Sequence, residues 1–163
     1  MKTLSDIDPE TLVYVDEAGV DNRLFRTHAR APRGVKIMAD IPGKKRERVS
    51  MMGGWMKHKF RAPFTFQGGC NAHVFNTWLE EVLLPDLPKG TTIVLDNAAF
   101  HKSVKTRELI EKSGCFLLFL PTYSPDLNPI EHCWHTLKSR LKPIIQQSTS
   151  HLQDIVGQCL LTI

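Results

Sequence analysis

The order of apolar segments along the chain is the feature that most restricts its fold. Strand patterns come first, and from Asn71 onward helix and strand patterns alternate. Strands joined by short connections pair as antiparallel neighbours, whereas strands separated by a helix need right-handed parallel crossovers. We therefore predict an α/β domain with a mixed five-stranded sheet, three antiparallel strands then two parallel, flanked by helices. The predicted strands are 12–16, 48–55, 59–67, 91–96 and 115–120.

Two of these strands end on an aspartate. The segment LVYVD ends at Asp16 and is predicted to be central, with Gly19 in the turn that leaves the sheet. The segment TTIVLD ends at Asp96 in the same way. Pro63 favours an edge position for strand 59–67, because proline cannot donate to a neighbouring strand. The apolar run 115–120 is predicted to be fully buried.

Length and composition indicate one ordinary globular domain spanning 1–163. The chain has 163 residues, of which 42% are hydrophobic and 23% are charged. No apolar run is long enough to cross a bilayer, and the polar N-terminus does not have the pattern of a secretory signal. Four cysteines without a C-x-x-C pair favour a reducing compartment, and we expect a cytoplasmic protein with no membrane partner.

A helix is predicted after the proline-rich loop PTYSPDLNP. Asn128 is expected as its N-cap and Pro129 as its first residue, with an apolar stripe that includes Trp134. Glu131 lies at the edge of this stripe, and His135 follows one turn later on the same face. A simpler interpretation of Glu131 is a capping box, in which its side chain bonds back to the Asn128 amide.

The three carboxylates Asp16, Asp96 and Glu131 are predicted to meet at one edge of the sheet. Open α/β sheets place their sites outside the carboxyl ends of the strands. Hard oxygen ligands from separate elements suit Mg²⁺ or Mn²⁺, and two such ions would support an in-line phosphoryl displacement. Taken one at a time, each aspartate could also be a turn former at a strand end.

Positive charge is concentrated in one part of the sequence. Between Arg23 and Arg61 there are 12 Lys and Arg against two acids, and the candidate DNA-binding residues there are Lys44, Lys45, Arg46 and Arg48. Such clustering is typical of a surface that binds nucleic acid phosphates, although a solvated basic loop would have the same composition.

Three sequence blocks resemble the catalytic blocks of mariner-like DDE transposases, and more narrowly the bacterial insertion-sequence 630 family. The blocks are VYVDEAGV, IVLDNAAFH and LPTYSPDLNPIEHCWHTLK, and 34 residues separate Asp96 from Glu131. The resemblance implies a ribonuclease H-like fold and Mg²⁺-dependent cleavage and joining of DNA strands. It also implies cut-and-paste movement of a short element.

The same resemblance implies roles for individual residues. Asp16, Asp96 and Glu131 would be the catalytic metal ligands for two Mg²⁺ or Mn²⁺ ions. Trp134 would anchor the helix that carries Glu131. The site-shaping residues would be Asn97, His101, Pro125, Asn128, Pro129 and His135.

The resemblance also implies partners. These are double-stranded DNA, as transposon ends and target, and a second copy in a homodimer. Members of the family usually carry a helix-turn-helix region before the catalytic domain, and we expect it to be absent here, so an upstream DNA-binding polypeptide is a further expected partner. The expected location is the bacterial cytoplasm, in association with the nucleoid.

Three other interpretations fit parts of the sequence. The same fold and acids serve ribonucleases H, Holliday-junction resolvases and retroviral-type integrases. A transposase remnant without activity could act as a DNA-binding module. A zinc protein is a third class, although no pair of its candidate ligands has finger-like spacing. Those candidates are Cys115, Cys133, His101, His132 and His135.

Overall fold

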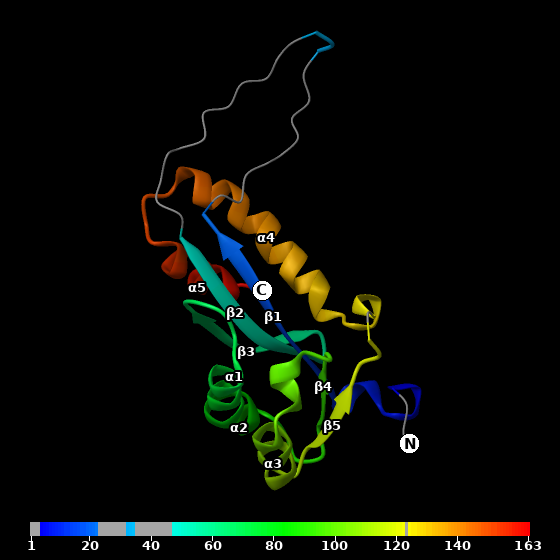
Figure 1. Ribbon diagram of the computed structural model, residues 1–163. Helices are drawn as coiled ribbons and strands as arrows, with labels where there is room; N and C mark the ends of the chain where they lie inside the picture. Colours follow the sequence, from blue (N-terminus) through cyan, green and yellow to red (C-terminus); the bar gives the residue numbers. More distant parts are fainter. Residues whose placement is uncertain (1–3, 23–31, 35–46, 123) are drawn as a thin grey trace.

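The structure, a computed structural model, describes residues 4–22, 32–34, 47–122 and 124–163. Its sheet has five strands in the order β3-β2-β1-β4-β5 (Figure 1). β2 is antiparallel to β1 and β3, whereas β4 is parallel to β1 and β5, so the predicted mixed sheet is confirmed. The strands are β1 (Leu12–Asp21), β2 (Arg48–Met56), β3 (Lys59–Phe66), β4 (Thr92–Leu95) and β5 (Phe116–Phe119).

The central strand β1 is longer than predicted. It continues to Asp21 because it stays paired with β2, so Asp16 lies inside the strand rather than at its end. Gly19 is therefore not in a turn. It pairs with Ser50, and its missing side chain leaves room for Arg48, whose guanidinium nitrogen would lie 2.9 Å from a Cβ atom there. Pairing with β4 nevertheless stops at Tyr14, just before Asp16.

Helices cover both faces of the sheet. The side chain of Asn71 caps α1 by accepting from Val74 N, and the hydroxyl of Ser103 caps α3 by accepting from Thr106 N. The helices are α1 (Ala72–Trp78), α2 (Leu84–Asp86), α3 (Val104–Lys112), α4 (Ile130–Gln147) and α5 (Leu152–Leu160). A π-helical turn, η3 (Leu79–Leu83), joins α1 to α2, and short 3-10 turns are η1 (Leu4–Asp6), η2 (Pro9–Thr11), η4 (Ala99–Lys102) and η5 (Pro125–Leu127). None of the described helices is long and apolar enough to cross a membrane.

Alternation along β1 separates two hydrophobic cores. Val13 and Val15 pack with the buried residues of α1, η3 and α3 on one face. Val20 packs with the buried faces of α4 and α5 on the other. Because successive strand residues point to opposite faces, Asp16 lies on the α4 side and Glu17 on the α1 side. The predicted apolar stripe of α4 is confirmed and includes the buried Trp134.

The two edge strands differ in how well they were predicted. β3 is an edge strand, as Pro63 indicated. Its register shifts opposite Met52 and Gly54, and Ala62 has a φ of 49°. β5 is the other edge strand, and Phe116 is 63% exposed, so the prediction of a fully buried strand at 115–120 was wrong. Sheet order, which the apolar run does not encode, decides this exposure.

The start of α4 also differs from the prediction. Pro129 occupies the N-cap position without a side-chain cap, and Asn128 instead ends the η5 turn. The Asn128 amide donates to the carbonyl of Pro125 at 2.9 Å. That amide is therefore committed to the η5 turn, and the capping-box explanation of Glu131 lacks the donor it requires.

Candidate active site

A pocket of about 400 Å³ opens at the point where β4 ends and β1 continues. Its lining includes Asp16 from β1, Asp96 from the end of β4 and Glu131 from the first turn of α4. Asn97, Pro125 and Asn128 line it as well. Three carboxylates that are far apart in the sequence thus face a common space, as predicted from the strand order.

Asp16 is held by the helix that covers it. The indole N–H of Trp134 donates to Asp16 Oδ2 at 3.1 Å. The pKa of Asp16 is raised to about 7, mainly by burial and also by the neighbouring charges of Glu17 and Glu131, and the hydrogen bonds to the carboxylate offset only part of this rise. A carboxylate whose pKa is raised by other carboxylates is stabilised by a cation placed among them.

Asp96 is held from the opposite side by His101. The Nδ1 atom of His101 lies 2.6 Å from Asp96 Oδ1, and the same oxygen accepts from the Ala98 amide at 2.9 Å. The hydrogen bond from His101 lowers the pKa of Asp96. The other ring nitrogen, Nε2, lies 2.8 Å from Oε1 of Glu17. One imidazole therefore joins a carboxylate of the pocket to a carboxylate behind it.

The ring of His101 is fully buried and its charge is stabilised by both neighbours. Burial alone would lower the pKa of His101, but the hydrogen bonds to Asp96 and Glu17 outweigh this effect and raise it to about 9. The imidazole also contacts the rings of Phe75 and Phe100, with centroid distances of 4.4 Å in both cases. Asp96 and Glu17 therefore stabilise the protonated form of His101, and Phe75 and Phe100 confine its ring.

The loop before α4 positions Glu131. The side-chain amide of Asn97 donates to the carbonyl of Leu120, which joins the end of β4 to the residue that follows β5. The η5 turn then brings Pro125 and Asn128 against the pocket. Glu131, the second residue of α4, is exposed, so its carboxylate is free to move toward a ligand in the pocket.

The donors around the pocket fit a hard divalent cation. Carboxylate and amide oxygens are the ligands that Mg²⁺ and Mn²⁺ prefer. Asn128 is 6% exposed, and its Oδ1 is buried without a hydrogen-bond partner among the described residues. A buried oxygen of this kind is costly unless a cation or a water molecule satisfies it.

The carboxylates are not already clustered as a coordination shell. Within the described ranges, no three His, Cys, Asp or Glu side chains are grouped closely enough to hold a metal ion. One oxygen of Asp96 is committed to His101 and one oxygen of Asp16 to Trp134. The shared pocket and the unpaired buried Asn128 oxygen favour a cation site, and the exposed side chain of Glu131 has several rotamers available to it.

The remaining predicted site residues are distributed unevenly. Pro129 is the N-cap of α4, beside the pocket, and exposed His135 does not line it. Arg48 begins β2 and pairs with Asp21, five positions along β1 from Asp16, so it is not part of the pocket. Lys44, Lys45 and Arg46 lie outside the described residues. The zinc candidates include His101, which is committed to two carboxylates instead.

The sequence analysis missed one residue that contacts the site, Glu17, and one contact of a residue that it named, Trp134. Glu17 follows Asp16 directly, and strand alternation could have placed it on the other face with a separate role. Trp134 was assigned only to helix anchoring, because the donor on its ring could not be paired with Asp16 before the packing of α4 on β1 was known.

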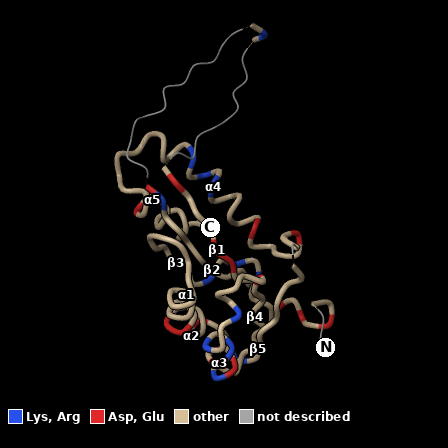
Figure 2. Tube along the Cα trace, in the orientation of Figure 1, with Lys and Arg blue, Asp and Glu red and all other residues tan. Residues whose placement is uncertain are grey.

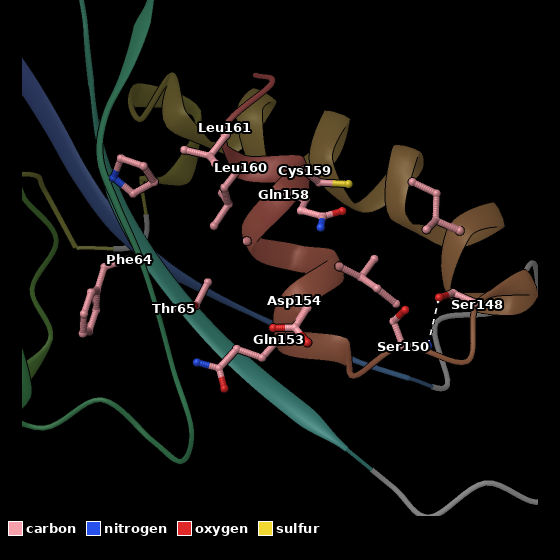
Figure 3. Close-up of a pocket in the computed structure, with 14 residues that line it drawn as sticks. Phe64, Thr65, Ser148, Ser150, Gln153, Asp154, Gln158, Cys159, Leu160 and Leu161 are labelled. Carbon is pink, nitrogen blue, oxygen red and sulfur yellow. Dashed lines mark hydrogen bonds between the residues drawn. The ribbon is translucent and has the colours of Figure 1, made fainter.

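A second, larger hollow of about 720 Å³ lies between β3 and α5. Figure 3 shows its lining, which is made of short polar side chains and of apolar residues such as Phe64 and Leu161. It contains Asp154 but no cluster of carboxylates, and it shares no residue with the acidic pocket. The three carboxylates are therefore found together in the smaller pocket.

Comparison with solved structures identifies the fold. The crystal structure of the Mos1 strand transfer complex has a TM-score of 0.71 at 18% identity, covering 93% of this chain and 46% of that one. A structure of the Mos1 transposase catalytic domain and Raltegravir with Mg has a TM-score of 0.65 at 16% identity, covering 95% and 71%. The predicted ribonuclease H-like fold is thereby confirmed.

Sequence comparison identifies the family. The Transposable element Tc1 transposase of Caenorhabditis elegans is 36% identical over 69 residues, which are 42% of this chain and 25% of that protein. The matched stretch thus covers about a quarter of the relative's length. The family described as DDE superfamily endonuclease matches residues 11–153. Because this match spans most of the sequence and all three acids of the pocket, the chain belongs to the DDE superfamily endonuclease family.

Proposed function

We propose that this chain is the catalytic domain of a transposase, which cleaves DNA strands and transfers them with the help of divalent metal ions. The observation that carries the proposal is the meeting of Asp16, Asp96 and Glu131 around one pocket, from three separate elements. Membership in the DDE superfamily endonuclease family supports the reaction class, and the mariner and Tc1 likeness supports transposition as its purpose.

In the proposed mechanism, Asp16, Asp96 and Glu131 hold two Mg²⁺ or Mn²⁺ ions. When bound, such ions activate the attacking oxygen and stabilise the leaving oxygen of an in-line phosphoryl displacement. Trp134 keeps Asp16 oriented, and His101 does the same for Asp96.

Basic side chains of the chain would bind the DNA phosphates. The Lys and Arg of α4 lie from the middle of the helix onward, away from Glu131 in its first turn (Figure 2). Phosphate contacts of this kind position DNA without reading its sequence. We include Lys44, Lys45, Arg46 and Arg48 in the proposed DNA-binding surface on the strength of their charge.

Several finer features are part of the same proposal. The SPDLNPIE block supports assignment to the bacterial insertion-sequence 630 branch, with a cytoplasmic, nucleoid-associated location. We also propose that 1–163 acts as a single catalytic domain, that it functions as a homodimer and that a separate DNA-binding polypeptide recognises the ends of the element. Size-exclusion chromatography with light scattering, without and with DNA, tests the dimer.

The decisive experiment measures Mg²⁺-dependent nicking and strand transfer of a labelled DNA duplex. Asp16→Asn, Asp96→Asn and Glu131→Gln should each abolish both reactions and leave the circular dichroism spectrum unchanged. The matched control is Asp126→Asn, because Asp126 is an exposed acid of the same loop that does not line the pocket. Equal activity in wild type and Asp96→Asn would remove the catalytic assignment.

The same assay separates the competing enzyme classes. An RNA–DNA hybrid and a four-way junction are supplied in place of the duplex, under the same metal conditions. Preferred cleavage of the hybrid would identify a ribonuclease H, and preferred cleavage of the junction a resolvase. Binding of DNA without any turnover would identify an inactive remnant.

A further inference from the structure

We propose that Glu17 is a positioning residue for the reaction: acting through His101, it holds Asp96 in the orientation that faces the pocket. The inference rests on the proposed function, since it concerns one of the carboxylates assigned there to metal binding. Glu17 would then be a fourth acid that contributes to the site. It lies on the opposite face of the sheet and orients a metal ligand without binding the ion itself.

The topology of the sheet creates a place for this arrangement. β4 pairs with β1 only as far as Val94 and Tyr14, and β1 then continues alone on that side. The η4 turn (Ala99–Lys102) follows the end of β4 and places His101 in the gap. Because Asp16 and Glu17 point to opposite faces, only Glu17 is directed toward the side on which α1 and η4 lie.

Distances show that the link is continuous. Glu17 Oε1 lies 2.8 Å from Nε2 of His101, and Nδ1 of the same ring lies 2.6 Å from Asp96 Oδ1. The two bonds use both nitrogens of the imidazole, so the ring cannot turn without breaking one of them. The Ala98 amide donates to the same Asp96 oxygen. Oδ1 of Asp96 therefore already accepts two hydrogen bonds, and Oδ2 is the oxygen that remains available to bind a ligand in the pocket.

Burial explains why the ring needs the outer carboxylate. The His101 side chain is 0% exposed and that of Glu17 is 15% exposed, whereas that of Asp96 is 47% exposed. A half-exposed aspartate has several rotamers available, and a rigid buried partner is what restricts it to one. Phe75 and Phe100 confine the imidazole sterically, and the bond from Nε2 to Glu17 fixes its rotation from the side opposite Asp96.

The backbone that carries His101 is independently anchored. Ser103 caps α3 immediately after the η4 turn, and the side-chain amide of Asn76 donates to its hydroxyl at 3.2 Å. Thr106 donates to Asn76 Oδ1 at 2.7 Å, which closes a buried network between α1 and α3. Loss of Glu17 would therefore leave the η4 turn in place and free only the ring and the Asp96 side chain.

Glu17 is not itself placed to hold the ion. It does not line the pocket, and its bonded oxygen faces His101. Outer residues that orient metal ligands commonly contribute about 10- to 100-fold in metal affinity. If replacing Glu17 changes metal affinity by this factor when His101 is present, and not at all when His101 is replaced, then Glu17 is a positioning residue. A direct ligand would change the affinity in both cases.

The test measures Mn²⁺ affinity of the purified chain by isothermal titration calorimetry. Glu17→Ala should weaken binding by about 10-fold or more. Glu17→Gln keeps an oxygen acceptor for Nε2 and should restore most of the affinity. Glu80→Ala is the control, because Glu80 is an exposed acid of η3, paired only loosely with Lys105 at 4.0 Å. Wild-type affinity in Glu17→Ala overturns the proposal.

A double-mutant cycle tests whether the effect passes through the ring. His101→Asn places an amide nitrogen near the position of Nδ1, so it keeps a donor for Asp96 and loses the bond to Glu17. Adding Glu17→Ala to His101→Asn should then weaken Mn²⁺ binding no further. If Glu17→Ala costs the same affinity in both backgrounds, Glu17 acts by another route and the proposal is overturned.

An NMR measurement reads the link without reference to metal or activity. Long-range proton–nitrogen spectra report both ring nitrogens of His101 in the metal-free protein. Glu17→Ala should shift the Nδ1 resonance as well as Nε2, because the ring moves relative to Asp96, and an unchanged Nδ1 resonance overturns the proposal. If Asp96→Asn binds Mn²⁺ like wild type, the proposed function fails instead, and the NMR comparison still decides the role of Glu17.

Discussion

The indole N–H of Trp134 donates to Oδ2 of Asp16 at 3.1 Å, across 118 positions of sequence. The bond joins the helix that carries Glu131 to the strand that carries Asp16. Trp134 is 2% exposed and its ring packs edge-on against Phe60, with centroids 5.3 Å apart. The position of one carboxylate of the pocket is therefore coupled to the packing of α4 on the sheet.

Trp134→Phe should weaken Mn²⁺ binding by about 10- to 100-fold, because the ring packing survives while the donor to Asp16 is lost. Calorimetric titration with Mn²⁺ measures the change. The matched control is Trp55→Phe, since Trp55 is a half-buried tryptophan of β2 that does not line the pocket. Equal losses in the two variants would show that the bond to Asp16 does not orient that carboxylate for the ion.

Asp16→Asn should stabilise the metal-free protein at pH 8 and have little effect at pH 4. The folded-state pKa of Asp16 is raised to about 7 from 3.8, so between these values the folded state holds a proton that the unfolded state has lost. Stability of the wild type therefore falls as pH rises through this window. The gain at pH 8 should be on the order of 4 kcal/mol, measured by urea unfolding in EDTA.

The control for this pH dependence is Asp126→Asn, which removes an exposed carboxylate near the same pocket. Its difference from wild type should not change with pH over the same range. A gain for Asp16→Asn that is equal at pH 4 and pH 8 would contradict the assignment of the raised pKa to Asp16.

Asn128→Leu should keep or increase the stability of the metal-free protein, by up to about 2 kcal/mol, because it removes a buried oxygen without a described partner. The same change should reduce the rise in melting temperature that Mg²⁺ produces. Asn71→Leu is the opposite control, since the Asn71 side chain caps α1 and its loss should cost about 1 kcal/mol. Destabilisation by both substitutions would show that Asn128 Oδ1 is satisfied in the folded protein.

Gly53→Ala should destabilise the fold by about 1–3 kcal/mol, because a Cβ atom there would overlap the ring of Phe60. Gly53 pairs with Asp16 across β1 and β2, and displacement of Phe60 would disturb Trp134. Thermal unfolding and Mn²⁺ titration should therefore both respond. Gly69→Ala is the control, since no atom of the residues that the structure describes lies within 4 Å of its Cβ position. Phe60→Leu in the Gly53→Ala background should recover part of the loss if the overlap is the cause.

Neutralising the predicted basic cluster should flatten the salt dependence of DNA binding. Each phosphate contact contributes about 0.9 to the slope of log affinity against log salt, so four lost contacts would lower it by about 3 to 4. Fluorescence anisotropy at several salt concentrations measures the slope for glutamine variants of Lys44, Lys45, Arg46 and Arg48. A set of equal charge serves as control: Lys89, Lys105, Arg107 and Lys112. If both sets of variants gave the same slope, the DNA would contact a surface other than this basic cluster.

Much of the fold follows from local patterns in the sequence. Apolar runs and period-two alternation predicted every strand of the sheet, and the helical repeat that follows Asn71 predicted the helix that begins beside it. The order of those elements then restricted the sheet to the observed mixed arrangement. Asp16, Asp96 and Glu131 could be expected at one edge for the same reason, since strand direction and crossover handedness are properties of the chain's order.

Other features depend on contacts between segments that are distant in the sequence. The extension of β1 past Asp16 comes from pairing with β2, and the exposure of Phe116 comes from the edge position of β5. Helix α4 begins one residue later than predicted, at Ile130, because the Asn128 amide donates within the η5 turn. None of these outcomes is encoded in a local repeat.

Sequence pattern thus determined which carboxylates share the pocket, because a chain's order of strands and helices dictates which ends lie together. Tertiary structure alone decided how each carboxylate is held. Trp134 reaches Asp16, and Glu17 reaches Asp96 through His101, only after helices pack on both faces of the sheet. Hydrogen bonds depend on distances of a few tenths of an ångström, and such distances exist only in the packed molecule.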